Sequence, residues 1–241
     1  MEEPVSRIPT GSKVLDAMLN GGYEKEVITT VYGPAGSGKT VLCLLCSINV
    51  ARSGKKVVYV DSEGGFSLER LKQVASHISQ DYKKILENII FLRPTSFAEQ
   101  KKSFEKLKDI VNDKIGLIVV DTIAMLYRLE LGKSEDVHDV NRELGRQISC
   151  LTDIARNKKI PVLITNQVYT DFDDKDKVNI VGGDILKYSS KCLIELQITP
   201  NGNRRAIIRK HRSLQSEMEI IFKIVEGGII GTKESRGFKL F

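Results

Sequence analysis

The sequence predicts an α/β protein in which a mostly parallel β-sheet lies between helices and gains antiparallel strands at its C-terminal end. Two observations predict this. Short apolar segments alternate with longer segments of helical period from residue 27 to residue 166. Beyond residue 190 the alternation stops, and two strand-like segments flank a turn. The 241 residues, 41% of them hydrophobic, suffice for one such domain.

Nine segments in the first two thirds of the chain alternate between strand and helix. Leu117–Val120 is continuously apolar, which is typical of a parallel strand covered on both faces. The helical segments are longer, and Phe97–Asn112 carries its Lys and Glu residues on one outer face. In chain order we expect strand Val27–Tyr32, helix Lys39–Arg52, strand Lys56–Val60, helix Ser67–Ser79, strand Ile89–Leu92, helix Phe97–Asn112, strand Gly116–Asp121, helix Val137–Asn157 and strand Pro161–Asn166.

The C-terminal quarter has a different pattern. The segments Cys192–Thr199 and Arg204–Lys210 flank Pro200-Asn201-Gly202-Asn203, which predicts a β-hairpin, and Met218–Val225 predicts a further strand. No repeat, low-complexity tract or Pro/Gly linker divides the chain. We therefore expect residues 1–241 to form one domain.

Composition excludes several classes of protein. The apolar run Val41–Ala51 is far shorter than the ~20 residues of a membrane span, and the acidic start of the chain is unlike a signal peptide. Of the four cysteines, Cys43 and Cys46 are close together, but no second pair stands at zinc-ligand spacing. We interpret Val41–Cys46 as a buried helix face on which cysteine acts as a small hydrophobic residue.

One segment matches the phosphate-loop pattern G-x-x-x-x-G-K-[ST] at every fixed position, between a predicted strand and a predicted helix. Glycines allow successive backbone N–H groups to surround a phosphate at the helix N-terminus. Lys39 is expected to bind the β- and γ-phosphates of ATP, and Thr40 to bind Mg²⁺. The loop consists of Gly33, Pro34, Ala35, Gly36, Ser37, Gly38, Lys39 and Thr40.

Two carboxylates are candidates to complete this site. Asp121 follows the buried strand at its carboxyl end, where ligands bind in open α/β sheets, and we expect it to bind the metal with Thr40. Glu63, just beyond the strand Lys56–Val60, is our candidate for activating the water that attacks ATP. Asp61 and Glu69 are the other candidates for this role. The alternative interpretation is that Glu63 is merely an exposed turn residue.

Charge is distributed unevenly along the chain. Lys and Arg exceed Asp and Glu by 37 to 31, and the whole surplus of six lies after Asp184. A solvated basic face is the common explanation, but such an asymmetry also indicates a polyanionic partner. Arg204, Arg205 and Arg209 of the predicted hairpin are therefore our candidate DNA-binding residues.

Several short strings in the right order resemble the ATPase core of the RecA/RadA recombinases, over essentially the whole chain from Ser6. The length of the chain is similar to that of the short archaeal paralogues of RadA. Besides the phosphate loop, the matching strings are Thr10-Gly11-Ser12, Val60-Asp61-Ser62-Glu63-Gly64-Gly65-Phe66 with Glu69-Arg70-Leu71, Asp121 with Leu126-Tyr127-Arg128, Ile164-Thr165-Asn166-Gln167, Gly182-Gly183-Asp184 and Arg209-Lys210-His211-Arg212.

The resemblance implies a RecA-like fold and further site residues. Glu63 would polarise the attacking water, Arg70 would lie over the adenine, and Gln167 would sense the γ-phosphate and move the following loop. Lys210 and Arg212 would complete the ATP site of a neighbouring subunit, with His211 facing the other way on the strand. A solvated basic strand end is the alternative for that pair.

The chain also departs from the family pattern. Only Met1–Pro9 precede the core, so we expect no N-terminal helical DNA-binding domain. The two segments that face DNA in the family, here Tyr127–Asp139 and Val168–Val181, each carry a net charge of −2. Loops that grip a phosphate backbone are expected to be basic.

These features together predict a DNA-binding accessory protein of homologous recombination and DNA repair that binds ATP and hydrolyses it weakly. Its expected partners are single-stranded or branched DNA, a RadA-type recombinase, a junction-resolving nuclease and further copies of itself, and no membrane. We expect it in the cytoplasm, associated with the nucleoid. The alternatives are a DNA-stimulated strand-exchange recombinase and a RecA-fold signalling ATPase that does not bind DNA.

Overall fold

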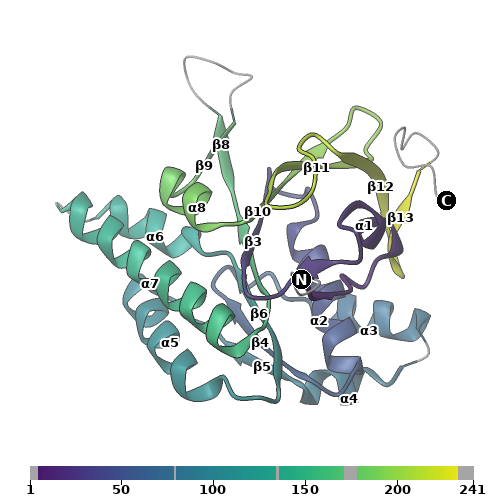
Figure 1. The fold of residues 1–241 in the computed structure, drawn as a ribbon, viewed down its shortest axis with the longest axis horizontal. Helices are drawn as coiled ribbons and strands as arrows, with labels where there is room; N and C mark the ends of the chain where they lie inside the picture. The colour runs from purple at the N-terminus through teal and green to yellow at the C-terminus, as the bar shows by residue number, and fades with distance from the viewer. Residues whose placement is uncertain (1–4, 79, 134–135, 171–177, 233–241) are drawn as a thin grey trace.

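A computed structural model describes residues 5–78, 80–133, 136–170 and 178–232 (Figure 1). Its main sheet has nine strands in the order β13-β12-β11-β10-β3-β7-β6-β4-β5. Neighbours from β10 to β5 are parallel, and neighbours from β10 to β13 are antiparallel. The strands are β3 (Ile28–Tyr32), β4 (Lys56–Asp61), β5 (Ile89–Leu92), β6 (Ile115–Asp121), β7 (Val162–Asn166), β10 (Cys192–Ile198), β11 (Arg204–His211), β12 (Glu219–Val225) and β13 (Gly228–Gly231).

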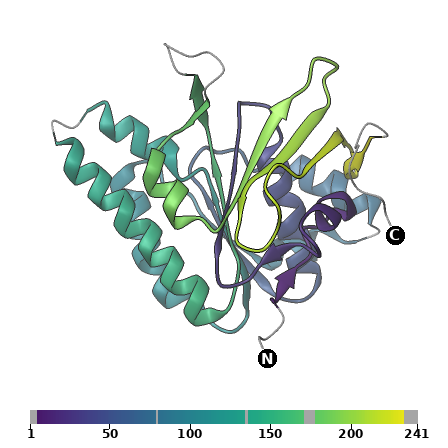
Figure 2. The same ribbon diagram turned by 45° about the horizontal axis from the view of Figure 1, so that its top comes forward.

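Helices cover both faces of this sheet, as Figures 1 and 2 show. Helices α1–α4 pack on one face and α5–α8 on the other. The fold class predicted from the alternation of elements is confirmed. The helices are α1 (Lys13–Met18), α2 (Lys39–Arg52), α3 (Leu68–His77), α4 (Tyr82–Glu87), α5 (Phe97–Ile110), α6 (Ala124–Leu131), α7 (Val137–Lys158) and α8 (Gly183–Ser189).

The apolar run in β6 explains why the sheet needs two helical layers. Leu117 and Val119 belong to the core with α1–α4, whereas Ile118 and Val120 belong to the core with α5–α8. Successive side chains of a strand point to opposite faces, so a strand buried on both faces is apolar throughout. All four are fully buried.

Some elements were not predicted because they are short or lie within expected loops. They include α1, α4, α6, α8, β13 and the small pair β1 (Arg7–Ile8) and β2 (Tyr23–Glu24). The segment Tyr127–Asp139 is no simple loop, because it contains the end of α6 and the start of α7. The segment Val168–Val181 contains a separate hairpin of β8 (Val168–Thr170) and β9 (Val178–Ile180). The charged residues 171–177, on which its net charge depends, lie outside the described residues.

The interpretation of the cysteine pair is confirmed. Cys43 and Cys46 are fully buried on α2 in the core shared with α1, α3 and α4. Burial raises the pKa of both thiols well above the ordinary value. Within the described residues, no helix is both long and apolar enough to cross a membrane.

Candidate functional site

The predicted phosphate loop connects the central strand β3 to α2 and is packed directly against the neighbouring strand. A Cβ atom on Gly33 would lie 2.3 Å from the carbonyl oxygen of Leu196 in β10, so only glycine fits there. Gly38 adopts a left-handed conformation immediately before α2. The strand–loop–helix setting expected from the sequence is therefore present.

Lys39 points back into the curve of this loop. Its Nζ donates hydrogen bonds to the carbonyl oxygens of Gly33 and Pro34, both at 2.9 Å. Burial lowers the pKa of Lys39, although the negative charges of Glu63 and Asp121 oppose that shift. The ammonium group is thus held close to two carboxylates at the mouth of the loop.

Thr40 and Asp121 both border Gly65. A Cβ atom on Gly65 would lie 3.5 Å from Thr40 Oγ1 and 3.8 Å from Asp121 Oδ2, so the absent side chain leaves room beside both oxygens. A hydroxyl and a carboxylate are hard oxygen ligands of the kind that Mg²⁺ binds, with water and phosphate oxygens as its other ligands. The donor set therefore fits the metal predicted for this site.

Two neighbours fix the orientation of the buried Asp121 carboxylate. Tyr59 on β4 donates its hydroxyl to Oδ2 at 2.9 Å, and Thr165 on β7 donates its hydroxyl to Oδ1. Burial, together with the negative charge of Asp121, raises the pKa of Tyr59, so this tyrosine remains a donor. Such supporting hydrogen bonds orient a metal ligand and limit its motion. Sequence reasoning missed both residues.

Glu63 and Gln167 are in direct contact, although 104 residues separate them. Gln167 Nε2 donates to Glu63 Oε1 at 2.6 Å, joining the turn after β4 to the end of β7. Partial burial and the charge of Asp121 raise the pKa of Glu63, while Lys39 and Gln167 oppose the rise. The structure thus brings the residue expected to activate water and the expected γ-phosphate sensor into one hydrogen-bonded pair.

The structure distinguishes Glu63 from Asp61 and Glu69, the other two candidates for activating the water. Asp61 is buried, and its two oxygens accept hydrogen bonds from the backbone N–H groups of Gly65 and Phe66, so it shapes the turn. Glu69 lies on the outer face of α3, 77% exposed, and pairs with Lys72. Of the three carboxylates, Glu63 is the one in contact with Gln167.

Arg70, expected over the adenine, is fixed near the phosphate loop by the turn between β12 and β13. Its guanidinium donates to the carbonyl oxygens of Val225 and Gly228. The adjacent Ile224 borders the loop, because its Cδ1 would lie 3.0 Å from a Cβ on Gly38. The planar guanidinium is therefore held in one place on the same side of the molecule as the phosphate loop.

The three arginines expected to bind DNA are engaged within the protein. Arg204 NH2 donates to the carbonyl oxygen of Gly36 in the phosphate loop at 3.1 Å. Arg205 lies 3.6 Å from Glu219, and Arg209 pairs with both Glu195 and Glu217. The three arginines are thus held by contacts within the protein, Arg205 and Arg209 by carboxylates and Arg204 by the nucleotide loop.

Lys210 and Arg212 do not point in the same direction, contrary to expectation. Lys210 Nζ donates to the carbonyl oxygen of Lys187 in α8 at 2.7 Å. Arg212 instead pairs with the buried Glu24, and His211 Nε2 lies 3.8 Å from the same carboxylate. The expectation that His211 faces away from both neighbours is wrong for Arg212, which shares Glu24 with it, because β11 ends at His211 and the chain turns there; Lys210 contacts a different element.

The buried Glu24 was not predicted as a site of any kind. Arg7 NH2 and Ser213 Oγ also donate to its Oε1, at 3.0 and 2.9 Å. Burial alone would raise the pKa of Glu24, but the hydrogen bonds from Ser213 and Arg212 lower it. This carboxylate ties the β1–β2 pair to the end of β11.

The central phosphate loop, the buried Asp121 behind it and the antiparallel extension of a parallel sheet define a RecA-like P-loop fold. Comparison with known families narrows this class, since the Rad51 profile matches residues 2–232. The chain belongs to the Rad51 family.

Individual relatives agree with this assignment and with the resemblance to short archaeal paralogues. The chain is 45% identical over 230 residues to the DNA repair and recombination protein RadB of Methanobrevibacter smithii, covering 93% of this chain and 95% of that protein. It is 42% identical over 220 residues to RadB of Methanocaldococcus jannaschii, covering 90% and 98%. A crystal structure of the RadB recombinase superposes with a TM-score of 0.82 at 38% identity, covering 94% of this chain and all of that one.

Proposed function

We propose that this protein is an ATP-binding, weakly ATP-hydrolysing, DNA-binding accessory factor of homologous recombination and DNA repair. The observation that carries the ATPase proposal is the convergence of Lys39, Thr40, Asp121, Glu63 and Gln167 at the carboxyl ends of β3, β4, β6 and β7. Ligands bind at this edge in open α/β sheets. The recombination role is supported by the similarity to RadB proteins.

Different residues of the site bind different parts of ATP and its metal ion. Backbone N–H groups of the phosphate loop surround the phosphates, and Lys39 places a positive charge at the β- and γ-oxygens. Thr40 and Asp121 would hold Mg²⁺, which would supply positive charge to offset that of the phosphates. Arg70 covers the adenine with its fixed guanidinium plane.

Glu63 and Gln167 act on the water and on the γ-phosphate. Glu63 accepts a proton from the attacking water, and partial burial raises its pKa toward the range useful for a general base. Gln167 holds the Glu63 carboxylate and exchanges this hydrogen bond for one to the γ-phosphate. Because β8 begins at the residue after Gln167, a movement of Gln167 on ATP binding is passed on to β8.

An accessory role is better supported than strand exchange. The segment after Gln167 carries a net charge of −2, which disfavours a grip on single-stranded DNA. RadA-type recombinases, a junction-resolving nuclease and further copies of this chain are the proposed partners. Lys210, which is not in an ion pair within the described residues, is the better candidate to reach a neighbouring subunit, since Arg212 is held by Glu24.

We expect ATP hydrolysis to be slow and little changed by DNA, because the segment that would couple the two is acidic. Phosphate release measured with and without single-stranded DNA at low salt tests this. The Lys39→Ala variant, prepared identically, measures contaminating activity. A large stimulation by DNA would favour the strand-exchange alternative, and the absence of any DNA binding would favour a signalling ATPase.

Arg204 offers a separate test of the nucleotide site. We expect Arg204→Ala to weaken ATP binding severalfold, because the hydrogen bond to Gly36 O that holds the tip of the phosphate loop is lost. Arg205→Ala is the matched control, since its neighbouring guanidinium pairs with Glu219 instead. Titration of each variant with a fluorescent ATP analogue measures the difference. Equal affinities in the two variants would contradict a role for Arg204 at the loop.

A further inference from the structure

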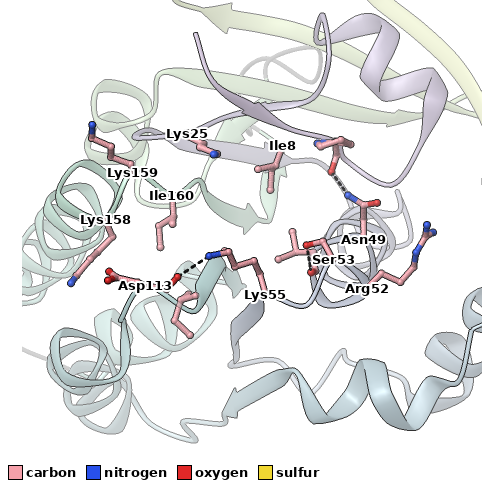
Figure 3. Close-up of a pocket in the computed structure, with 14 residues that line it drawn as sticks. Ile8, Lys25, Asn49, Arg52, Ser53, Lys55, Asp113, Lys158, Lys159 and Ile160 are labelled. Carbon is pink, nitrogen blue, oxygen red and sulfur yellow. Dashed lines mark hydrogen bonds between the residues drawn. The ribbon is translucent and has the colours of Figure 1, made fainter. Parts of the chain in front are cut away.

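A second charged feature lies at the opposite edge of the sheet from the phosphate loop. A cavity of about 580 Å³ opens there, beneath the amino ends of the parallel strands (Figure 3). Lys25 comes shortly before β3, Lys55 directly before β4, and Ile160 shortly before β7. Its lining comes from β1, from the ends of α2 and α7 and from the starts of β4 and β6.

The lining is strongly basic. Five cations border the cavity, and in the described part of the chain none of them forms an ion pair; they are Lys25, Arg52, Lys55, Lys158 and Lys159. Lys55 Nζ donates to the backbone carbonyl oxygen of Asp113 at 2.9 Å, which leaves its charge uncompensated by the carboxylate. By contrast, Arg205, Arg209 and Arg212 in the C-terminal quarter are all paired with carboxylates.

Helix capping does not account for these cations. Helices α2 and α7 both end at the cavity, but backbone N–H groups that follow each helix already donate to carbonyl oxygens of its last turn, those of Val50 and Ala51 in α2 and of Ala155 and Arg156 in α7. Asn88 Nδ2 also donates to the carbonyl oxygen of Ala51. Each helix end contributes about half a negative charge, so with Asp113 the five cations leave a surplus of about three positive charges.

We infer that this basic cavity binds the phosphate backbone of DNA. Helix C-termini face the cavity, so a small nucleotide would find no cradle of backbone N–H groups there. Exposed lysines on separate segments instead suit an extended polyanion held without regard to sequence. This inference rests on the proposed DNA-binding function and assigns it to a surface that does not include the hairpin arginines Arg204, Arg205 and Arg209.

The test is a salt titration of DNA binding. The variant Lys25→Gln/Lys158→Gln/Lys159→Gln is compared with Lys83→Gln/Lys102→Gln/Lys106→Gln, which removes the same charge from the outer faces of α4 and α5. Fluorescence anisotropy of labelled single-stranded and branched DNA gives the affinity. We expect the cavity variant to bind at least about tenfold more weakly at 0.1 M salt, with a log–log salt slope lower by about two. The control variant is expected to stay close to the parent.

Further measurements distinguish a loss of DNA binding from a loss of folding, and a wrong binding surface from a protein that does not bind DNA. Replacing the same three lysines by arginine keeps the charge and is expected to restore DNA binding. ATP binding at the opposite edge reports that each variant is folded; should the triple variant not fold, the exposed pair Lys158→Gln/Lys159→Gln replaces it. Equal loss in the cavity and control variants, or no loss in either, overturns the inference and leaves the proposed function standing. A parent protein that binds none of these DNAs overturns the DNA-binding function and the inference together.

Discussion

Replacement of Lys39 by alanine is expected to weaken ATP binding by about 10- to 100-fold, because charge-assisted hydrogen bonds contribute about 1.5–3 kcal/mol. Lys39 Nζ lies within the curve of the phosphate loop, 2.9 Å from two of its carbonyl oxygens. Its substitution removes the positive charge that the β- and γ-phosphates meet there. Calorimetric titration with ATP and Mg²⁺ measures the loss.

Two controls make this result specific. Lys72→Ala removes a lysine from the outer face of α3, where it pairs with Glu69, and is expected to leave ATP affinity unchanged. Lys39→Arg keeps the charge but not the compact ammonium group, and is expected to restore affinity only in part. A Lys39→Ala protein that is folded and binds ATP like the parent would show that the loop does not hold the phosphates.

Glu63→Gln is expected to lower the rate of ATP hydrolysis by about 10²- to 10⁴-fold, the range for loss of a general base. ATP affinity is expected to change little, because the proton is accepted only as the bond breaks. Glu69→Gln is the matched control, since this carboxylate lies on the outer face of the next helix. Single-turnover hydrolysis measures the rate, and turnover of Glu63→Gln at the parent rate would refute the assignment.

The raised pKa of Glu63 gives the same assignment a pH signature. A general base must be ionised, so activity is expected to fall as the pH drops through the pKa of Glu63. Partial burial and the charge of Asp121 raise that pKa, so the fall comes at a higher pH than for an ordinary glutamate. The pH profile of hydrolysis at saturating ATP, compared with that of Glu69→Gln, measures the midpoint. A profile without this acidic limb would contradict the role of Glu63.

The fold was predictable because its signals are local. In β6, Leu117–Val120 is apolar at every position, and only a strand covered on both faces requires this. The phosphate loop was equally predictable from the sequence, because its glycines and Lys39 form the phosphate-binding backbone conformation within eight consecutive residues. Short elements such as α4 and β13 were missed, because too few residues display a period.

Only the tertiary structure shows which group each charged side chain contacts. Arg204 meets Gly36 across 168 residues, and Arg212 meets Glu24 across 188. A count of charges along the chain placed the basic surface in the C-terminal quarter, whereas the structure pairs Arg209 with Glu195 and Glu217 nearby and Arg212 with the distant Glu24. The order of strands in the sheet sets which distant residues become neighbours, and no local pattern encodes that order. For the same reason, the lysines before the central strands became a cluster only when parallel pairing aligned the strand ends at one edge.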